Sequence, residues 1–333
     1  MKSRRTLGAL AAVTMLFGTA GCGIFVGTSQ QSTESPDGQV EKSTITIGVD
    51  PSIGMAPLYV ARDQGYFAEE GLDVKIVTLT GSGENLDRLL AGDVDLTFAN
   101  YPAIVRAQQK AAGKAEVKIV ADAVAAKPDS SAVVVNKDSP YRNPDDLEDK
   151  TIGVPARGGI AELAVKSGMR AARADPSGVD WQVMRFADML PKLQGGEIDA
   201  AYLEEPYLTV AQAQLGVWTV FQPMVGRLDG IGLSGYAALE KTTQAYPNTV
   251  AAFQRAVLKV HRSATTPEGQ KALNGALISK LHIDPEIAAV LHLPAYPLTA
   301  DPTRLQRVPD LMREYGIIKK AFDIRPMILQ GKS

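Results

Sequence analysis

Short β-branched runs alternate with segments of helical hydrophobic spacing along much of the chain. Residues 44–49 form a β-branched run that predicts a strand, whereas residues 56–67 carry apolar side chains at helical spacing. Residues 72–79 alternate as a strand does, residues 85–91 are helical, and residues 94–99 are again strand-like. Strands that alternate with helices predict parallel sheets joined by right-handed crossovers.

The same pattern occurs a second time. The stretch LLAGDVDLTFANYP begins at Leu89, and a related stretch, LQGGEIDAAYLEEP, begins at Leu193. A Thr-Ile-Gly-Val run likewise begins at Thr46 and again at Thr151. Two matched segments at nearly one offset predict an internal repeat of one α/β unit. The second unit has predicted strands at residues 151–154, 179–185 and 198–203, and predicted helices at residues 161–172 and 187–194.

The segments outside the repeat predict how the two units are joined. Residues 130–135 are a candidate crossing between the units, and the Gly-rich residues 230–238 are a candidate return crossing. Two crossings permit hinge closure around a ligand. We therefore expect one lobe from residues 44–133 plus 236–333 and a second from residues 134–235. Helices are predicted near the C-terminus at residues 250–263, 267–280 and 302–315.

Composition excludes several classes of function. The 333 residues have 45% hydrophobic and 22% charged side chains, which is typical of a globular protein. Lys and Arg number 35 against 37 Asp and Glu, so the chain has no basic excess with which to bind nucleic acid. A single cysteine excludes a disulfide framework and a zinc site built from several thiolates, and we expect no metal and no cofactor.

The first 22 residues predict export. A positive segment at residues 2–5 precedes the uncharged and mostly apolar residues 7–21, which are too few to span a bilayer. Cys22 follows small residues directly, and this arrangement resembles the lipobox of bacterial lipoproteins, which implies lipidation of Cys22. The alternative is an ordinary signal peptide with an incidental cysteine. Residues 23–43 predict a flexible tether, so we expect residues 1–22 to be a lipoprotein signal peptide and the body to be anchored by lipid at the outer face of the bacterial cell membrane.

Several motifs follow one another at defined spacing: GMAPLYVA at residues 54–61, QGYF at 64–67, EGLDV at 70–74, the Leu-x-x-Gly-Asp-Val-Asp stretch from Leu89, and residues 145–154 and 196–206. In this order and spacing the motifs resemble the solute-binding proteins of nitrate, sulfonate, taurine and thiamine-pyrimidine importers. The resemblance implies a type II periplasmic-binding-protein fold, with two α/β lobes joined by a two-crossing hinge. It also implies no catalysis, a small-molecule solute as ligand, and ABC permease subunits as partners.

Ligands of open parallel sheets bind outside the carboxyl ends of the strands. Gly-rich turns at residues 81–83 and 158–159 precede helices there, where backbone N–H groups can approach an anion, although each could be a plain strand-to-helix turn. Arg157 could hold a sulfonate, nitrate or carboxylate by two parallel hydrogen bonds; the alternative is a solvated surface arginine. The candidate ligand-binding residues are Ser52, Met55, Gly81, Ser82, Asn85, Asn100, Tyr101, Arg157, Gly158, Gly159, Tyr202 and Glu205.

Glu204 and Glu205 are adjacent, so on an extended chain their side chains point to opposite faces. The family resemblance favours Glu205 as the carboxylate that lines the cleft, but the sequence leaves the choice open. Arg157 with Glu205 would suit a zwitterion such as taurine. We therefore expect a small anionic or zwitterionic organic solute of the aliphatic sulfonate type, with a thiamine-pyrimidine precursor or similar heterocycle as the alternative.

Two other functions compete with import. A fungal branch of the resembling family is an enzyme that makes the thiamine pyrimidine, and it carries a cysteine cluster. This chain has only Cys22, and it shows no arrangement of catalytic nucleophile and base, so we expect no enzyme. A binding module that feeds a sensor rather than a permease stays open. We expect a monomer that touches the membrane only through its lipid.

Overall fold

The structure is a computed structural model that describes residues 38–111, 113 and 116–331. These residues belong to one compact unit, Ser35–Ser333. The predicted signal segment, Cys22 and most of the predicted tether lie outside the described residues. Within the described part of the chain, no helix is long and apolar enough to cross a membrane.

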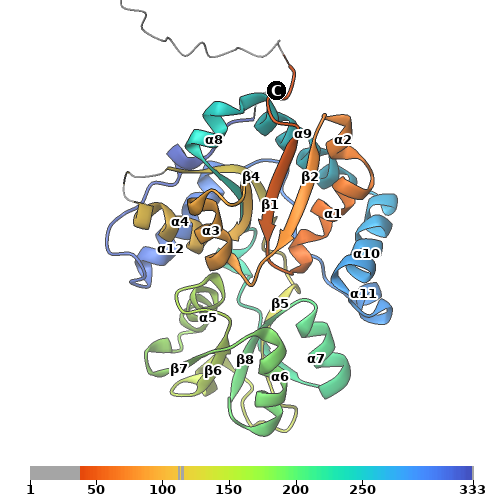
Figure 1. Cartoon of the computed structure of the whole chain (residues 1–333). Helices are drawn as coiled ribbons and strands as arrows, with labels where there is room; N and C mark the ends of the chain where they lie inside the picture. The colour runs from red at the N-terminus through yellow and green to blue at the C-terminus, as the bar shows by residue number, and fades with distance from the viewer. Residues whose placement is uncertain (1–37, 112, 114–115, 332–333) are drawn as a thin grey trace, which may run out of the picture. The chain divides into compact units, whose positions relative to one another are not determined.

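Five strands form the first sheet in the order β2-β1-β3-β10-β4, of which β1, β2 and β4 are labelled in Figure 1. The first three strands of the chain run parallel, whereas β10 lies antiparallel between β3 and β4. We call this sheet, with the helices that pack on it, lobe 1. The strand bounds are β1 Thr44–Val49, β2 Asp73–Thr78, β3 Leu96–Asn100, β4 Val117–Ala125 and β10 Gly232–Leu239.

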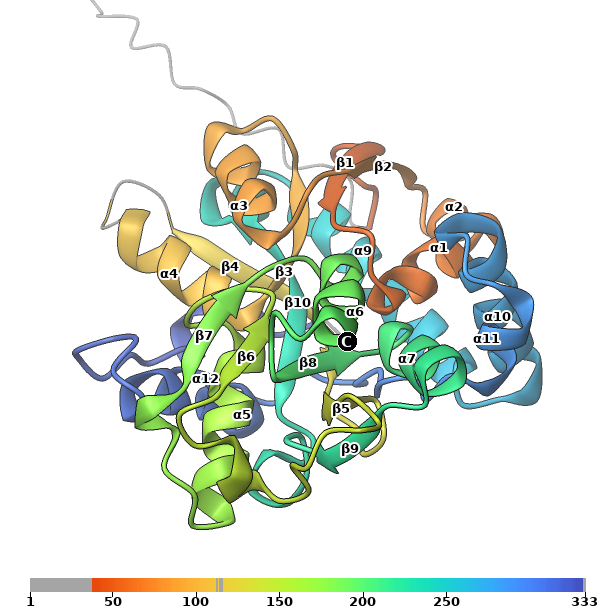
Figure 2. The same ribbon diagram turned by 90° about the horizontal axis from the view of Figure 1, so that it is seen from below.

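The second sheet repeats this arrangement in the order β7-β6-β8-β5-β9, and we call it, with its helices, lobe 2 (Figure 2). Strands β6, β7 and β8 are parallel, and β5 pairs antiparallel with both β8 and β9. The predicted two-lobed α/β fold is confirmed, with one antiparallel strand inserted in each sheet. The bounds are β5 Ser131–Val135, β6 Thr151–Val154, β7 Asp180–Val183, β8 Ala200–Glu204 and β9 Trp218–Phe221.

The repeated aspartate has the same structural role in each unit. The Asp95 carboxylate accepts a 2.9 Å hydrogen bond from the Thr46 backbone N–H, and Asp199 accepts a 2.9 Å bond from Thr151. Each aspartate N–H in turn donates to the carbonyl of the same threonine at 2.9 Å. The aspartate of the repeated motif therefore fastens the first strand of its unit to the start of the third strand.

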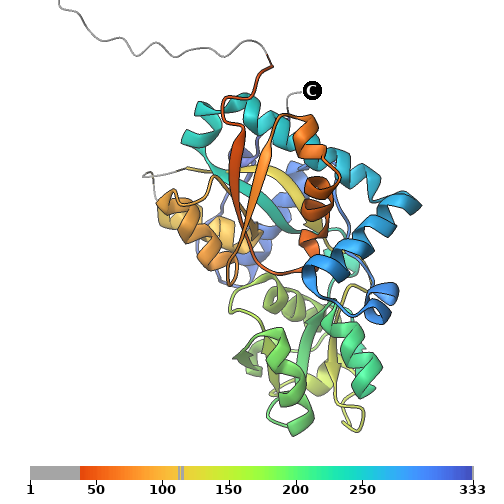
Figure 3. The same ribbon diagram turned by 45° about the vertical axis from the view of Figure 1, so that its right-hand side comes forward.

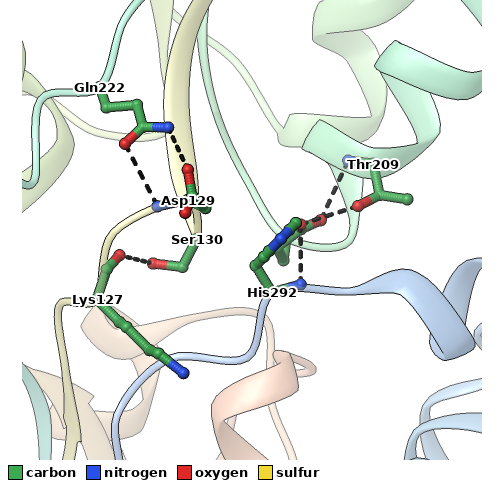
Figure 4. Close-up of polar contacts among 7 residues, drawn as sticks. Lys127, Asp129, Ser130, Thr209, Gln222 and His292 are labelled. Atoms are coloured by element: carbon green, nitrogen blue, oxygen red, sulfur yellow. Dashed lines mark hydrogen bonds and ion pairs between the residues drawn. The ribbon is translucent and has the colours of Figure 1, made fainter.

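Two crossings join the lobes. One runs from β4 to β5 through residues 126–130, and the other runs from β9 to β10 through residues 222–231. The crossings contact each other, because the Gln222 amide donates to the Asp129 carboxylate at 2.5 Å (Figure 4). The Asp129 N–H also donates to the Gln222 side-chain oxygen at 3.4 Å. These two hydrogen bonds therefore tie the crossings to each other.

The lobe boundaries drawn from the sequence, at 133/134 and 235/236, fall inside strands β5 and β10. The apolar runs that suggested crossings are strands inside the sheets, and each has a partner on both sides. β5 pairs with β8 in lobe 2, and β10 pairs with β3 in lobe 1. The crossings themselves are residues 126–130, which precede β5, and residues 222–231, which precede β10.

Helices cover both faces of the lobe 1 sheet (Figures 1 and 3). On one face, Phe67 and Phe253 stack at 5.5 Å between ring centroids.

The predicted helix over residues 56–67 is interrupted by Gly65, whose φ of 80° lies in the left-handed region. The three predicted C-terminal helices are confirmed as α9, α10 and α12, and the short α8 and α11 were not predicted. The lobe 1 helices are α1 Ala56–Asp63, α2 Tyr66–Glu69, α3 Ser82–Ala91, α4 Tyr101–Ala111, α8 Glu240–Ala245, α9 Pro247–Ser263, α10 Pro267–Leu281, α11 Pro285–Val290 and α12 Pro302–Glu314.

Lobe 2 has three longer helices, of which two, α6 and α7, contact β8 (Figure 2). Residues 161–172 and 187–194 were predicted as helices, and α7 was not. The helices are α5 Ile160–Ala171, α6 Phe186–Gly195 and α7 Tyr207–Leu215.

Candidate functional site

Hydrogen bonds bring together two of the lobe 1 candidates at the carboxyl ends of the strands. The Ser82 hydroxyl, in the first turn of α3, accepts a 3.1 Å bond from the Asn100 N–H at the end of β3. The Asn100 side-chain oxygen in turn accepts from the Ala103 N–H at 2.9 Å, in the first turn of α4. Ser82 and Asn100 are partly exposed, as are Ser52 and Gly81. These polar groups therefore stand together at one rim of lobe 1.

Asn85 is a fully buried amide beneath that rim. Its Nδ2 donates to the Phe98 carbonyl at 2.7 Å and to the Asp50 carboxylate at 3.4 Å. Its Oδ1 has no hydrogen-bond partner among the described residues. A buried acceptor without a partner costs free energy, because it has lost water and gained nothing in return. Asn85 therefore offers an acceptor to an N–H or O–H group from outside the chain.

Glu204, the last residue of β8 in lobe 2, lies within electrostatic reach of Asp50 in lobe 1. Burial, and next the charge of Asp50, raise the pKa of Glu204 to about 7. Burial also raises the pKa of Asp50. Two nearby carboxyl groups in poorly solvated surroundings resist joint ionisation. The pair therefore favours a proton or a cation between the lobes. We call the residues Asp50, Ser82, Asn85, Asn100 and Glu204 the interlobe seam.

Glu205, which the family resemblance favoured as the cleft carboxylate, is a buried side chain with partners of its own. It is 3% exposed, and its carboxylate accepts from the Thr209 hydroxyl at 2.8 Å and from the Thr209 N–H at 3.1 Å (Figure 4). It also accepts a 3.3 Å bond from the backbone N–H of His292 in lobe 1. Because successive residues of a strand alternate in direction, Glu204 faces the seam while Glu205 anchors α7.

Three further candidates are core side chains. Tyr101 is fully buried and donates from its hydroxyl to the Asp122 carboxylate at 2.8 Å. Met55 is fully buried, and Tyr202 is 2% exposed with its ring beside that of Phe186. The side chains of these three residues pack inside the lobes and leave almost no surface for a solute to contact.

Arg157 forms an ion pair within its own lobe. Its Nε lies 3.0 Å from an oxygen of Glu162, while its side chain is 58% exposed. The same Glu162 is 1% exposed and also pairs with Lys166 at 2.5 Å. Arg157 lines a cavity of about 530 Å³ along α5, together with residues such as Arg170 and Tyr315, and no seam residue lines that cavity.

Gly158 and Gly159 are buried where the two lobes touch. Gly158 has a φ of +63°, and the Ile317 side chain lies 3.1 Å from the place where a Cβ would be. Its carbonyl accepts a 2.9 Å hydrogen bond from the guanidinium of Arg106 in α4. This glycine turn is therefore covered by lobe 1.

Asp50 and Arg106 were not among the candidates from the sequence, and the family resemblance favoured Glu205 over Glu204. A signal for Glu204 was present, because the repeat aligns it with Asn100, which was a candidate. The same alignment pairs Tyr101 with Glu205, and both are buried. Asp50 directly follows β1, so its position at the rim also follows from the predicted strand.

Comparison with known proteins agrees with this fold. A family model described as NMT1/THI5 like matches residues 52–268, which is more than half of the chain. The formylaminopyrimidine-binding protein of Halalkalibacterium halodurans is 27% identical to the chain over 243 residues, which make up 71% of this chain and 70% of that protein.

Solved structures with the same fold include two periplasmic binding proteins. The aliphatic sulphonate binding protein SsuA from Escherichia coli has a TM-score of 0.69 and 20% identity, and the match covers 87% of this chain and 93% of that chain. The nitrate-binding protein NrtA from Synechocystis PCC 6803 has a TM-score of 0.70 and 14% identity, and the match covers 86% and 85% of the two chains. At these identities the likeness shows the fold alone.

Proposed function

The chain belongs to the NMT1/THI5-like family, and on this premise we propose that it is the extracytoplasmic solute-binding component of an ABC importer. The solute would enter when the lobes part about the paired crossings, and it would be enclosed when they close. The two-lobed fold with rims in contact supports this proposal, as do the binding proteins of the same fold. The partners would be permease subunits, and the chain would act as a monomer.

We propose a solute that presents N–H donors or a positive charge to the seam. The observation that carries this choice is the Asp50–Glu204 pair. Burial raises the pKa of both carboxyl groups, and a cation or N–H donor placed between them would favour their ionised forms. The unpartnered Asn85 Oδ1 adds a third acceptor. An amino-substituted pyrimidine has N–H donors of this kind, and the curated relative from Halalkalibacterium halodurans is named for a formylaminopyrimidine.

An aliphatic sulfonate is the second candidate, supported by the fold shared with SsuA. Two carboxyl groups at the seam oppose a simple anion such as nitrate or an alkanesulfonate. Taurine would fit better, because its ammonium group could lie between Asp50 and Glu204. Arg157, the anion-binding candidate from the sequence, is already paired with Glu162.

We propose no catalysis at this site. The nearby polar groups are two carboxyl groups, two amides and a hydroxyl, without an adjacent nucleophile and base pair among the described seam residues. The single cysteine, Cys22, lies in the leader, so the chain lacks the cluster expected of a pyrimidine-forming enzyme.

Anchoring through Cys22 completes the proposal. A lipid on Cys22 and the tether of residues 23–43 would hold the receptor near its permease at the outer face of the cell membrane. Cys22→Ser is expected to move the protein from the membrane fraction to the soluble fraction. If Cys22→Ser stayed in the membrane fraction, lipid anchoring through Cys22 would be contradicted. The proposal of solute binding would not be affected.

A thermal-unfolding screen of the full chain tests the proposed function. The probes are formylaminopyrimidine, taurine, ethanesulfonate and nitrate at millimolar concentration. We expect formylaminopyrimidine to raise Tm most, taurine to raise it less, and the two simple anions to leave it unchanged, because a ligand stabilises only the state that binds it. Stabilisation by ethanesulfonate or nitrate alone would contradict the ligand class, and no response to any probe would count against solute capture.

A further inference from the structure

Arg106 lies on the lobe 1 side of the contact between the lobes. It belongs to α4, which packs against strands β3, β4 and β10 of the lobe 1 sheet. Its guanidinium Nη1 donates a 2.9 Å hydrogen bond to the carbonyl of Gly158, which belongs to lobe 2. This hydrogen bond therefore links the two lobes directly. The covalent links between them are the two crossings.

The Gly158 carbonyl is held in a fixed direction. On one side, the Gly158 N–H donates to Glu162 at 2.7 Å, and Glu162 is itself buried and paired with Lys166. On the other side, Ile317 of the segment after α12 packs against the Gly158 Cα, at 3.1 Å from the Cβ position. The acceptor for Arg106 is therefore preorganised, so forming the bond orders little besides the arginine side chain.

Arg106 has no carboxylate partner in the described part of the chain, unlike Arg227 of the second crossing, which pairs with Glu314. Partial burial of the guanidinium lowers the pKa of Arg106, because burial disfavours the charged form. A partly desolvated guanidinium needs its hydrogen-bond acceptor, and a charge-assisted bond is stronger than a neutral one. Separation of the lobes would break this bond.

We propose that Arg106 is an interlobe latch, a positioning residue that stabilises the closed arrangement of the lobes through the Gly158 carbonyl. This inference rests on the proposed function, in which closure encloses the solute. The latch opposes the repulsion between Asp50 and Glu204, so the closed fraction of the empty receptor reflects a balance between the two. Arg106 acts at the rim and touches no solute.

Distances between spin labels on the two lobes of the ligand-free full chain test the latch. The labels replace the exposed residues Asp87 in α3 and Gln194 in α6 by cysteine, in a Cys22→Ser background. Arg106→Met is expected to lower the closed-to-open ratio by at least about tenfold, which corresponds to the lower end for a hydrogen bond to a charged group. Arg106→Lys keeps the charge and one donor, so it should fall between wild type and Arg106→Met.

Arg88→Met is the matched control, because Arg88 is an exposed helical arginine of the same lobe that pairs with Asp93. It should leave the ratio unchanged, and circular dichroism should show that all variants are folded. If Arg106→Met does not fold, Arg106→Gln replaces it. The latch is overturned if Arg106 variants match the control, or if the empty wild type shows no closed population. Since no solute is present, these outcomes are independent of whether the proposed solute binds.

Discussion

Glu204 of lobe 2 and Asp50 of lobe 1 are coupled across the seam, since burial and then the Asp50 charge raise the pKa of Glu204 to about 7. Glu204 is the last residue of β8, and Asp50 directly follows β1. The fold therefore places both residues at the carboxyl ends of strands. A cation or N–H donor between them would relieve both the desolvation and the repulsion. Five predictions follow from this seam and its surroundings.

Removal of either seam carboxylate should weaken the binding of an N–H-donor solute. Glu204→Gln and Asp50→Asn are each expected to lower the affinity for formylaminopyrimidine by at least about tenfold, because a hydrogen bond to a charged group contributes roughly 1.5–3 kcal/mol. Isothermal titration calorimetry measures the change. Glu197→Gln, at an exposed lobe 2 glutamate that pairs with Lys192, is the control and should bind as wild type does. Equal affinity of Glu204→Gln and this control would remove Glu204 from the site.

The affinity for a solute that stays cationic should depend on pH. A proton and the solute compete for Glu204, whose pKa is raised to about 7. The association constant is therefore expected to rise with pH up to about 7, by at most about tenfold per pH unit, and then to level off. The same titration on Glu204→Gln should give a flatter profile. A profile that falls as pH rises would indicate that a protonated seam is the binding form.

Glu204 should also make the stability of the empty protein depend on pH. Between its ordinary value of 4.5 and about 7, the folded state holds a proton on Glu204 that the unfolded chain has released. Its contribution to the free energy of unfolding therefore falls as pH rises through this window. Chemical denaturation should show wild type losing stability relative to Glu204→Gln over the same range. A difference that is constant with pH would argue against a raised pKa.

Glu205 should matter for stability rather than for solute contact. Glu205→Ala leaves the Thr209 hydroxyl and N–H and the His292 N–H without their acceptor, so the free energy of unfolding should fall by about 1–3 kcal/mol. The corresponding decrease in Tm is roughly 2–4 °C per kcal/mol for a chain of moderate size. Glu197→Ala is the exposed control. If Glu205→Ala kept the Tm of wild type but lost solute binding, Glu205 rather than Glu204 would be the carboxylate that contacts the solute.

Arg157 should contribute little to binding. Its guanidinium is mostly exposed and pairs with Glu162, so Arg157→Ala is expected to change the affinity for formylaminopyrimidine or taurine by less than about threefold. Calorimetry on the variant checks this. A loss of tenfold or more would show that Arg157 leaves Glu162 and turns toward the solute.

The topology could be predicted from the sequence because local patterns encode it. β-branched runs and helical spacing gave the order of elements, and the repeated Asp95 and Asp199 marked equivalent strands. The choice between neighbouring side chains depends on tertiary packing. The Tyr101 side chain points into lobe 1, where Asp122 accepts a hydrogen bond from its hydroxyl. The Arg157 guanidinium pairs with the buried carboxylate of Glu162 in its own lobe. The contact of Arg106 with Gly158 exists only when the lobes meet, so no local pattern predicts it.

A crystal structure of the complex with formylaminopyrimidine would show whether Asp50 and Glu204 hold the solute. We expect solute nitrogen atoms between the lobes, at about 2.7–3.2 Å from carboxylate oxygens of both Asp50 and Glu204. A solute bound in the cavity beside Arg157, or one whose anionic group faces the seam while both carboxylates are turned away, would contradict this expectation.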